Sequence, residues 1–287
     1  MTATASSPKL RVDTRGTNEL PPHLDENLLT PRFYVTEFKK ASKTELTDAR
    51  EEFEAMLSEM KADYNCTHFD RKASLDRLQE LPQKAKETYE SYLVRSVISE
   101  FSGFLLFKEI SNRLKKEGNR DLGKLFQFLA RDEARHAGFL SRALVAEGIE
   151  VDLPHLGGKR AATWFPISWV IYSVYLSEKI GYWRYILMDR HLKANPDQAF
   201  APLFDFFEPW CQDENRHGDC FTVMMRCWPG ITKGFRGKLL SRFFLWSVFL
   251  THTLTVSERG EVYELLGIDP KEFDEEVIKR TNHTSKN

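Results

Sequence analysis

Cysteine is scarce in this chain, and its spacing excludes two common kinds of site. The 287 residues contain four cysteines, Cys66, Cys211, Cys220 and Cys227, and no two of them form a CxxC pair. A rubredoxin-type iron site and a zinc ribbon both need such pairs, so the sequence argues against both. The same spacing gives no reason to expect the disulfide framework of a secreted protein.

Excess charge and long apolar runs are also missing. Lys and Arg total 41 against 42 for Asp and Glu, a formal charge of −1, whereas a broad nucleic-acid-binding surface needs a basic excess. No run of 18 apolar residues exists, so we expect no helix that spans a membrane. Residues 1–30 are rich in Thr, Ser and Pro and lack the apolar stretch of a signal peptide. We expect them to form a flexible N-terminal arm of an intracellular protein.

Glycine and proline are few, at 15 and 12 residues, and the long stretches between them have apolar residues three and four positions apart, as in a helix. Alternation of β-branched residues is nowhere sustained. Helices are predicted at about 48–64, 88–116, 122–146, 169–193, 200–227 and 238–266. We therefore expect an all-α chain in which residues 31–287 form a single domain.

Two turns arrange four of these helices. Glu117-Gly118-Asn119 precedes the helix at 122–146, and Ala194-Asn195-Pro196 follows the helix at 169–193. Helices joined by short connections are antiparallel neighbours. The pattern predicts a four-helix bundle made of two helical hairpins, with additional flanking helices.

Each predicted hairpin contains the same short motif. Residues 132–136 read DEARH and residues 213–217 read DENRH. Residues i and i+3 share one face of a helix, so the Glu and His of each motif are expected to converge on one metal ion. The pairs are Glu133 with His136, and Glu214 with His217. An iron site in a helical bundle also needs a carboxylate from each of two other helices.

Distance from the turns selects these carboxylates. Glu100 lies 18 residues before Gly118, and Glu178 lies 18 residues before Pro196. At about 1.5 Å per residue, these groups and the motifs lie roughly 22–27 Å from their turns, at one level of the bundle. Both carboxylates have apolar neighbours, where an unpaired charge costs on the order of several kcal/mol. Glu109 lies nine positions beyond Glu100, too near the turn. We expect six metal ligands, with a buried ion-pair network as the alternative.

Four longer stretches resemble one family of enzymes. They are EFSGFLLFKE (100–109), RDEARHAGFL (131–140), YLSEKIGYWRY (175–185) and FEPWCQDENRHGD (207–219). They are similar to the aerobic magnesium-protoporphyrin IX monomethyl ester oxidative cyclases, diiron enzymes of the ferritin-like superfamily, and the resemblance runs from about residue 28 to the end. It implies a ferritin-like four-helix bundle. Position by position, it implies the same six catalytic metal ligands: Glu100, Glu133, His136, Glu178, Glu214 and His217.

The resemblance implies an oxygenase of chlorophyll or bacteriochlorophyll synthesis. These enzymes form the isocyclic fifth ring by oxidising magnesium-protoporphyrin IX 13-monomethyl ester to divinyl protochlorophyllide. The implied cofactors are two Fe in a carboxylate-bridged centre, with O2 as co-substrate. Electrons from NADPH are expected to arrive through ferredoxin, because no Gly-rich nucleotide-binding turn is visible in the sequence. The resemblance also implies an auxiliary cyclase subunit and peripheral contact with a photosynthetic membrane, from its cytoplasmic or plastid stromal side.

Residues beside the six ligands suggest two further roles. The Asp of each motif could accept the free ring N–H of a ligand His on the facing helix, with the motif's Arg neutralising that Asp; surface i,i+3 ion pairs are the alternative. Each lone Glu is followed three residues later by Gly, which gives either close helix contact or room beside the metals for oxygen and the substrate's methylpropionate arm. These residues are Asp132, Arg135, Asp213, Arg216, Gly103 and Gly181.

Other interpretations stay open. A ferritin-like iron-storage or peroxide-handling protein has the same fold, and a ribonucleotide reductase small subunit would need a Tyr near the irons, such as Tyr175. A non-catalytic scaffold of pigment synthesis would need no metal. The apolar runs 164–176 and 243–250 could touch a membrane, but we expect them to be buried helix faces. Cyclase chains continue beyond the match to VIKRTNHTSKN at 277–287, so we expect the family's C-terminal tail to be absent here.

Overall fold

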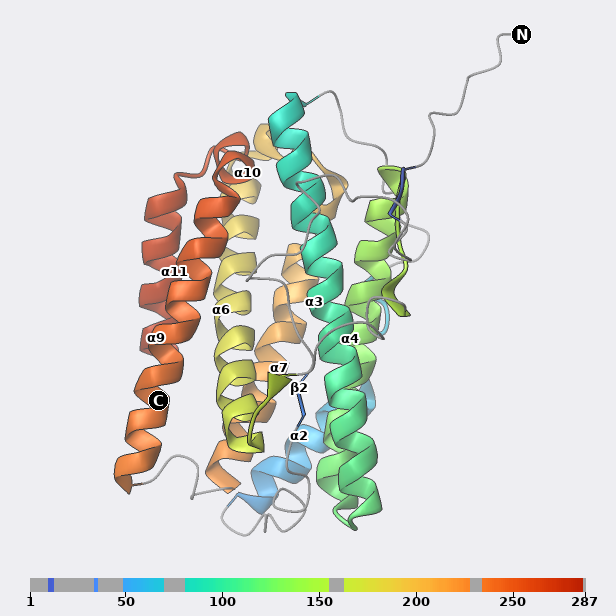
Figure 1. Ribbon diagram of the computed structural model, residues 1–287, viewed down its shortest axis with the longest axis vertical. Helices are drawn as coiled ribbons and strands as arrows, with labels where there is room; N and C mark the ends of the chain where they lie inside the picture. The colour runs from blue at the N-terminus through green and yellow to red at the C-terminus, as the bar shows by residue number, and fades with distance from the viewer. Residues whose placement is uncertain are drawn as a thin grey trace, which may run out of the picture.

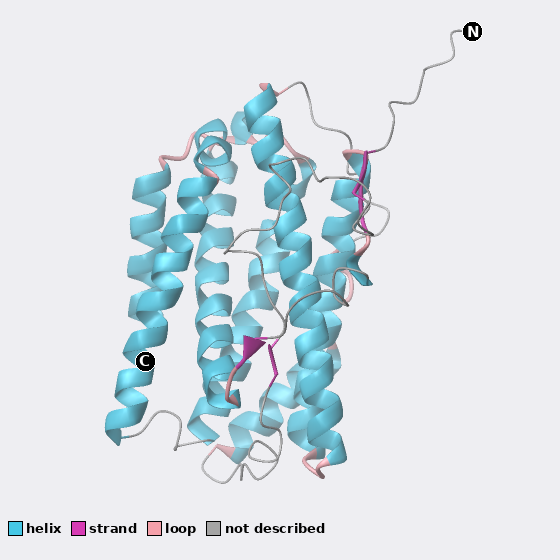
Figure 2. Ribbon diagram, viewed as in Figure 1, coloured by secondary structure: helices cyan, strands magenta, loops and turns pink. Residues whose placement is uncertain are grey.

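The computed structural model describes residues 10–12, 34–35, 49–69, 81–154, 163–227 and 234–285. Nearly all of the described chain is helical, with a few very short strands (Figure 2). The helices are α2 (Arg50–Ala62), α3 (Gln83–Lys116), α4 (Arg120–Ala146), α6 (Ile167–Ala194), α7 (Phe207–Cys227), α9 (Gly234–Glu258), α10 (Gly260–Leu265) and α11 (Pro270–Thr284). The predicted all-α class is confirmed.

Four long helices form the bundle. α3 packs along α4, and α6 packs along α7, as two antiparallel hairpins (Figure 1). At the first turn, Gly118 has a φ of +96°, a conformation that favours glycine. The Asn119 side chain then accepts a hydrogen bond from the backbone N–H of Leu122 at 3.2 Å and so caps α4. The predicted pair of hairpins is confirmed.

The second hairpin has a longer connection than the sequence suggested. Two short 3-10 helices, Pro196–Gln198 and Pro202–Phe206, precede α7. The helix predicted from about residue 200 therefore begins at Phe207 instead. The two prolines explain the difference, because proline starts a helical turn readily but supplies no backbone N–H to continue one.

The flanking helices differ from the prediction at 238–266. The predicted helix is interrupted at Arg259, which separates α9 from α10. The glycine that follows favours this interruption, because glycine is a poor helix former. A further helix, α11, was not predicted. Its signals are Asp269, whose carboxylate accepts the backbone N–H of Glu272 at 2.8 Å, and Pro270 at the first helical position.

The short strands are confined to two parallel pairs. β1 (Leu10–Val12) pairs with β3 (Ile149–Val151), and β2 (Tyr34–Val35) pairs with β4 (Thr163–Trp164). Leu10–Val12 falls within the expected flexible arm, and here it forms a backbone ladder. The domain boundary proposed at residue 30 lies outside the described residues.

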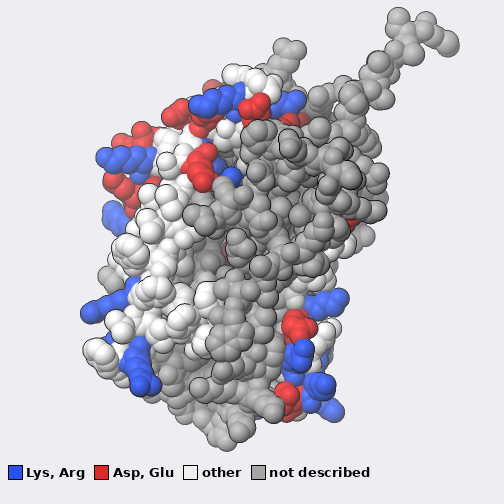
Figure 3. Space-filling model, viewed as in Figure 1, with Lys and Arg blue, Asp and Glu red and all other residues white. Residues whose placement is uncertain are grey.

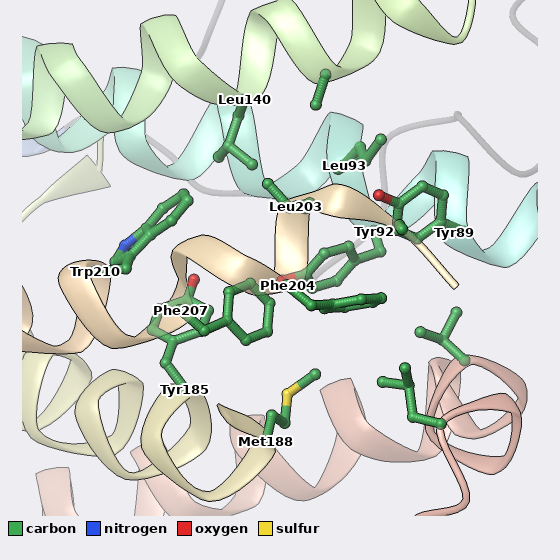
Figure 4. Packing of buried hydrophobic residues seen from close by; sticks show 14 of the residues in the cluster. Tyr89, Tyr92, Leu93, Leu140, Tyr185, Met188, Leu203, Phe204, Phe207 and Trp210 are labelled. Carbon is green, nitrogen blue, oxygen red and sulfur yellow. The ribbon is translucent and has the colours of Figure 1, made fainter. Parts of the chain in front are cut away.

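Two apolar clusters fill the bundle. One contains Tyr92, Leu93, Leu140, Tyr185, Phe204, Phe207 and Trp210, part of which Figure 4 shows. The other contains Phe107, Leu125, Leu129, Tyr172 and Phe221. Along α3, Glu100 falls between Ile98 of the first cluster and Leu106 of the second. The predicted metal ligands therefore occupy a polar layer between two apolar cores.

Candidate metal centre

All six predicted ligands are buried in this polar layer, each contributed by one of the four bundle helices. Their exposed fractions are Glu100 9%, Glu133 5%, His136 0%, Glu178 6%, Glu214 6% and His217 0%. Burying four carboxylates and two imidazoles together is costly unless something neutralises them. This layer therefore has the composition of a cation site.

The six side chains form two groups of three. One group is Glu100, His136 and Glu214, and the other is Glu178, His217 and Glu133. Within each group, one ligand atom per residue lies within 4.8 Å of the others. Each group therefore takes a Glu and a His from one hairpin and the motif Glu from the other.

This grouping differs from the expected pairing of Glu133 with His136. Residues three positions apart point in directions about 60° apart around a helix axis and differ in height. The two side chains consequently reach different groups, and the same holds for Glu214 and His217. Because a carboxylate has two oxygens, each motif Glu could join the two groups.

The same ring atom of each histidine faces the carboxylates. His136 Nδ1 lies 3.1 Å from Glu100 Oε2. His217 Nδ1 lies 3.3 Å from Glu178 Oε2 and 3.3 Å from Glu133 Oε1. A metal ion among these oxygens would meet Nδ1, so Nε2 is the atom left to carry the ring proton.

The Nε2 atoms face the aspartates of the opposite motifs. His136 Nε2 lies 3.0 Å from Asp213 Oδ2, a hydrogen bond, whereas His217 Nε2 lies 3.7 Å from Asp132 Oδ2 and has no hydrogen-bond partner. Both aspartates are buried, with side chains 0% and 2% exposed. Their depth excludes the alternative of simple surface ion pairs.

Arginines neutralise the aspartates to different degrees. Arg135 Nη1 donates to Asp132 Oδ1 at 3.2 Å, and Arg131 Nε donates to the same atom at 2.9 Å. Arg216 Nη1 lies 3.7 Å from Asp213 Oδ1, which is longer than a hydrogen bond. The predicted Asp–Arg pairing is therefore close around Asp132 and loose around Asp213.

Trp210 is the main residue that the sequence reasoning missed. Its indole Nε1–H donates to Glu214 Oε1 at 2.9 Å, and its ring lies 4.8 Å from the His136 ring. The sequence could have indicated it, because Trp210 lies four residues before Glu214 and the two side chains therefore share one face of the helix. His68 and Asp63 were also missed. His68 Nδ1 lies 3.6 Å from Asp213 Oδ1, and Asp63 Oδ1 accepts a hydrogen bond from Arg135 Nη1 at 2.7 Å. Neither carries a helical-spacing signal, because both lie in the loop after α2.

The glycines three residues after the lone carboxylates both face the adjacent helix of their own hairpin, which favours the predicted role of close helix contact. A Cβ added at Gly103 would lie 2.9 Å from Glu133 Oε2, and one at Gly181 would lie 3.5 Å from Glu214 Oε2. The absent side chain at Gly103 therefore makes room for Glu133, whereas a Cβ at Gly181 would make only an ordinary contact with Glu214. Glu133 occupies the space beside Gly103, and room for oxygen and substrate beside Gly181 stays a prediction.

Burial and neighbouring charges shift the pKa values of the side chains in the metal-free layer. Burial, followed by the nearby charges of Glu100 and Glu178, raises the pKa of Glu133 well above its ordinary value, and burial with Glu178 does the same for Glu214. Burial opposes protonation of His136, but hydrogen bonds to Asp213 and Glu100 outweigh it and raise the pKa. These raised pKa values favour protonated side chains in the layer when no metal is bound.

The donor set matches a pair of iron ions. Carboxylate oxygens and imidazole nitrogens together are suitable ligands for iron, and four Glu with two His are the donors of diiron sites in four-helix bundles. The fold and the layer therefore define a chain of the ferritin-like diiron class. In agreement, the sequence profile of the rubrerythrin family matches residues 91–225.

Comparison with known proteins identifies the family within this class. A magnesium-protoporphyrin IX monomethyl ester oxidative cyclase of Prochlorococcus marinus strain SARG is 78% identical over 95% of this chain and 78% of its own length. Cyclases of strain MIT 9211 and of Thermosynechococcus vestitus are 75% and 53% identical, over 100% and 91% of this chain and 82% and 73% of their own lengths. The chain belongs to this family of oxidative cyclases. No solved structure matches it.

Proposed function

We propose that this chain oxidises magnesium-protoporphyrin IX monomethyl ester to divinyl protochlorophyllide, closing the fifth ring of chlorophylls. The observation that carries the proposal is the pair of buried Glu–His–Glu groups in a member of the cyclase family. An iron-storage protein would share the fold, but relatives with the cyclase name match the chain over almost its whole length.

Six side chains would hold two irons in this layer. Glu100, His136 and Glu214 would surround one, and Glu178, His217 and Glu133 the other. When bound, the irons supply the redox chemistry that lets O2 attack an unactivated C–H bond. The apolar clusters on both sides of the layer keep water from the reacting groups.

The chain's own residues fix the protons around the centre. Asp213 accepts the Nε2 proton of His136, which leaves Nδ1 free to bind metal. The hydrogen bond from Trp210 orients one oxygen of Glu214 and leaves the other toward Gly181. These contacts position the ligands before the metal arrives.

Electrons would come from outside the chain. O2 is the proposed co-substrate, and the reductant is NADPH acting through a separate ferredoxin-type protein, with an auxiliary cyclase subunit as a further partner. Tight calorimetric binding of NADPH by the isolated chain would contradict this part of the proposal.

Iron content and turnover test the function. The purified chain should contain two irons and, with reductant and O2, convert the monomethyl ester to divinyl protochlorophyllide. A chain that binds no iron would be a scaffold. A chain with two irons that oxidises Fe(II) but never turns over the porphyrin with a complete electron-transfer system would be a storage or peroxide-handling protein.

The outer helix α9 supports a further proposal on location. Two apolar runs were predicted to be buried helix faces. In the first, the side chains described from residue 165 to 176 are buried or partly buried, whereas the second, 243–250, includes exposed side chains. Large apolar side chains on α9 are exposed at intervals of three or four residues: Phe235 82%, Leu239 59%, Phe243 53%, Trp246 66%, Leu250 45% and Leu254 48%. We call these six residues the α9 stripe.

The α9 stripe fits a membrane surface better than a membrane span. Among the described residues, α9 alone is long and apolar enough to cross a bilayer. However, its other face packs on α6 and α11, and the exposed Arg236, Lys238 and Arg242 lie in its first half. Figure 3 shows basic groups beside a largely uncharged surface on this side. An apolar face with basic flanks lies in the interface of an anionic membrane.

Vesicle binding tests this location. The protein should bind vesicles that contain anionic lipid, and Trp246→Glu should weaken binding because it places a charge among the acyl chains. Val145→Glu is the matched control, since Val145 is also exposed, at 43%, but lies on α4. Equal binding by the Trp246 variant and the wild type would show that α9 does not face the membrane.

A further inference from the structure

A second polar cluster, largely buried, lies where the bundle meets the flanking helices. It contains two arginines, Arg184 on α6 and Arg259 between α9 and α10. Three tyrosines surround them: Tyr92 of α3, Tyr185 of α6 and Tyr263 of α10, with exposed fractions of 5%, 2% and 2%. None of these residues belongs to the metal centre.

The two guanidinium groups are almost unpaired within the described chain. Arg259 is only 9% exposed, and its buried Nε has no hydrogen-bond partner among the described residues. Its guanidinium carbon lies 4.8 Å from the centre of the Tyr92 ring. Within the same described residues the buried Nε of Arg184 also lacks a partner, and its Nη2 donates to the Tyr185 hydroxyl at 3.2 Å.

Nearby carboxylates are engaged elsewhere. Asp274 accepts from His252 Nδ1 at 2.7 Å and from Thr253 Oγ1 at 2.8 Å, and Glu258 forms an ion pair with Arg95. Burial and the positive charge of Arg184 together lower the pKa of Arg259. Arg259 is buried without a carboxylate partner among the described residues, and Arg184 beside it is partly buried. Uncompensated buried charge is costly, so the two arginines favour the binding of an anion.

We propose that Arg184 and Arg259 bind the free propionate of the porphyrin substrate. This inference rests on the function proposed above. In the monomethyl ester one propionate is esterified and the other is a carboxylate, the one ionised group on the macrocycle's edge. Two guanidiniums with free N–H donors match a carboxylate, which accepts on both oxygens.

The location of the cluster agrees with this role. Arg184 lies six residues after Glu178 on α6, which is about 9 Å along the helix axis. The neighbouring Tyr185 ring packs 5.2 Å from Trp210, the residue that donates to Glu214. The two propionates of the substrate are on adjacent pyrrole rings, so a carboxylate held at the arginines would place the esterified propionate, the side chain that is oxidised, toward the metal centre.

Paired ligands test the inference through binding rather than turnover. The affinity of the iron-loaded protein for magnesium-protoporphyrin IX monomethyl ester is compared with its affinity for the dimethyl ester, by quenching of porphyrin fluorescence. Wild type should bind the monomethyl ester about tenfold or more tightly, since hydrogen bonds to a charged group discriminate by that factor. Arg259→Gln and Arg184→Gln should each remove most of this preference while dimethyl ester affinity and iron content stay unchanged.

Controls separate the outcomes. Arg190→Gln removes an exposed charge from the same helix as Arg184 and should keep the full preference. Arg259→Gln should be at least as heat-stable as wild type, because it removes an unpaired buried charge. Equal binding of the two esters by wild type, or an undiminished preference in both variants, would overturn the carboxylate site alone. If wild type bound neither ester, the proposed function would fail as well.

Discussion

The two hairpins present the same ligands in the same order, yet they support them differently. Four residues before Glu214 stands Trp210, which donates a hydrogen bond to that carboxylate at 2.9 Å. Four residues before Glu133 stands Leu129, a fully buried side chain with no hydrogen to donate. The duplicated motif thus repeats the metal-binding atoms but not their surroundings, so the two metal positions are expected to be inequivalent.

The aspartates show the same asymmetry. Asp132 has close arginine partners but lies 3.7 Å from its histidine, whereas Asp213 lies 3.0 Å from His136 with its arginine 3.7 Å away. One aspartate is therefore held mainly by arginines, and the other mainly by a ligand histidine. The two hairpins therefore repeat the motif but differ in the charged groups that surround it.

The largest expected effect tests what the two halves share. Glu100→Ala and Glu178→Ala should each reduce iron from two ions per chain to one or none. Each should also lower turnover on the order of 100-fold or more, since losses outside the ligand shell alone reach about 10- to 100-fold. Iron analysis and circular dichroism check this. Glu109→Ala, which removes a half-exposed carboxylate of α3, should change neither iron nor turnover. Full iron and activity in either ligand variant would refute the ligand assignment.

A second prediction concerns what the halves do not share. Asp213→Asn keeps the shape of the side chain but removes the charge that faces His136, and should weaken iron binding about 10- to 100-fold. Asp132→Asn should cost less, because the contact with His217 is longer and arginines already neutralise Asp132. Iron titration in the presence of a competing chelator measures both. Equal losses would mean that the asymmetry has no energetic consequence.

The sequence revealed the ligands because helix rise is constant. Counting residues from Gly118 and Pro196 placed all six side chains at one level, and the structure groups these same residues. The partition into groups could not be counted, because it depends on how each helix is rotated against its neighbours. Glu133 and His136 therefore join different groups although they lie on one helix.

Burial was harder to predict than periodicity. The run at 243–250 is as apolar as a core segment, but α9 lies outside the four-helix bundle, where it packs on α6 and α11. Nothing in the local spacing of Phe243 or Trp246 indicates how many helices surround them. The break at Arg259 was also missed, although the glycine that follows it is a weak sequence signal for the end of a helix.

The metal-free protein should lose stability as pH rises. The pKa values of Glu133, Glu214, His136 and His217 are all raised. The folded state therefore binds more protons than the unfolded chain, and the free energy of unfolding falls as pH increases from the unfolded-chain values through the raised ones. Asp132, Asp213 and Glu178, whose pKa values are lowered, matter only in more acidic solution.

Thermal melts at about pH 6 and about pH 8 check this expectation. The metal-free protein should melt several degrees lower at the higher pH. The iron-loaded protein should show little of this decrease, because its ligands have already given up their protons to bind metal. A metal-free protein that became more stable on the alkaline side would show that the buried carboxylates are not protonated in the absence of metal.

The smallest expected effect separates the two glycines. At Gly181 an added methyl group would lie 3.5 Å from Glu214, an ordinary contact, so Gly181→Ala should keep both irons and stabilise α6 by up to about 1 kcal/mol. At Gly103 the methyl would lie 2.9 Å from Glu133 Oε2. The carboxylate must move, so Gly103→Ala should gain no stability and should bind iron more weakly. Denaturant melts of the metal-free forms and iron titration measure the pair. If the two alanine variants behaved alike, the shorter distance between Gly103 and Glu133 would have no effect on stability or iron binding.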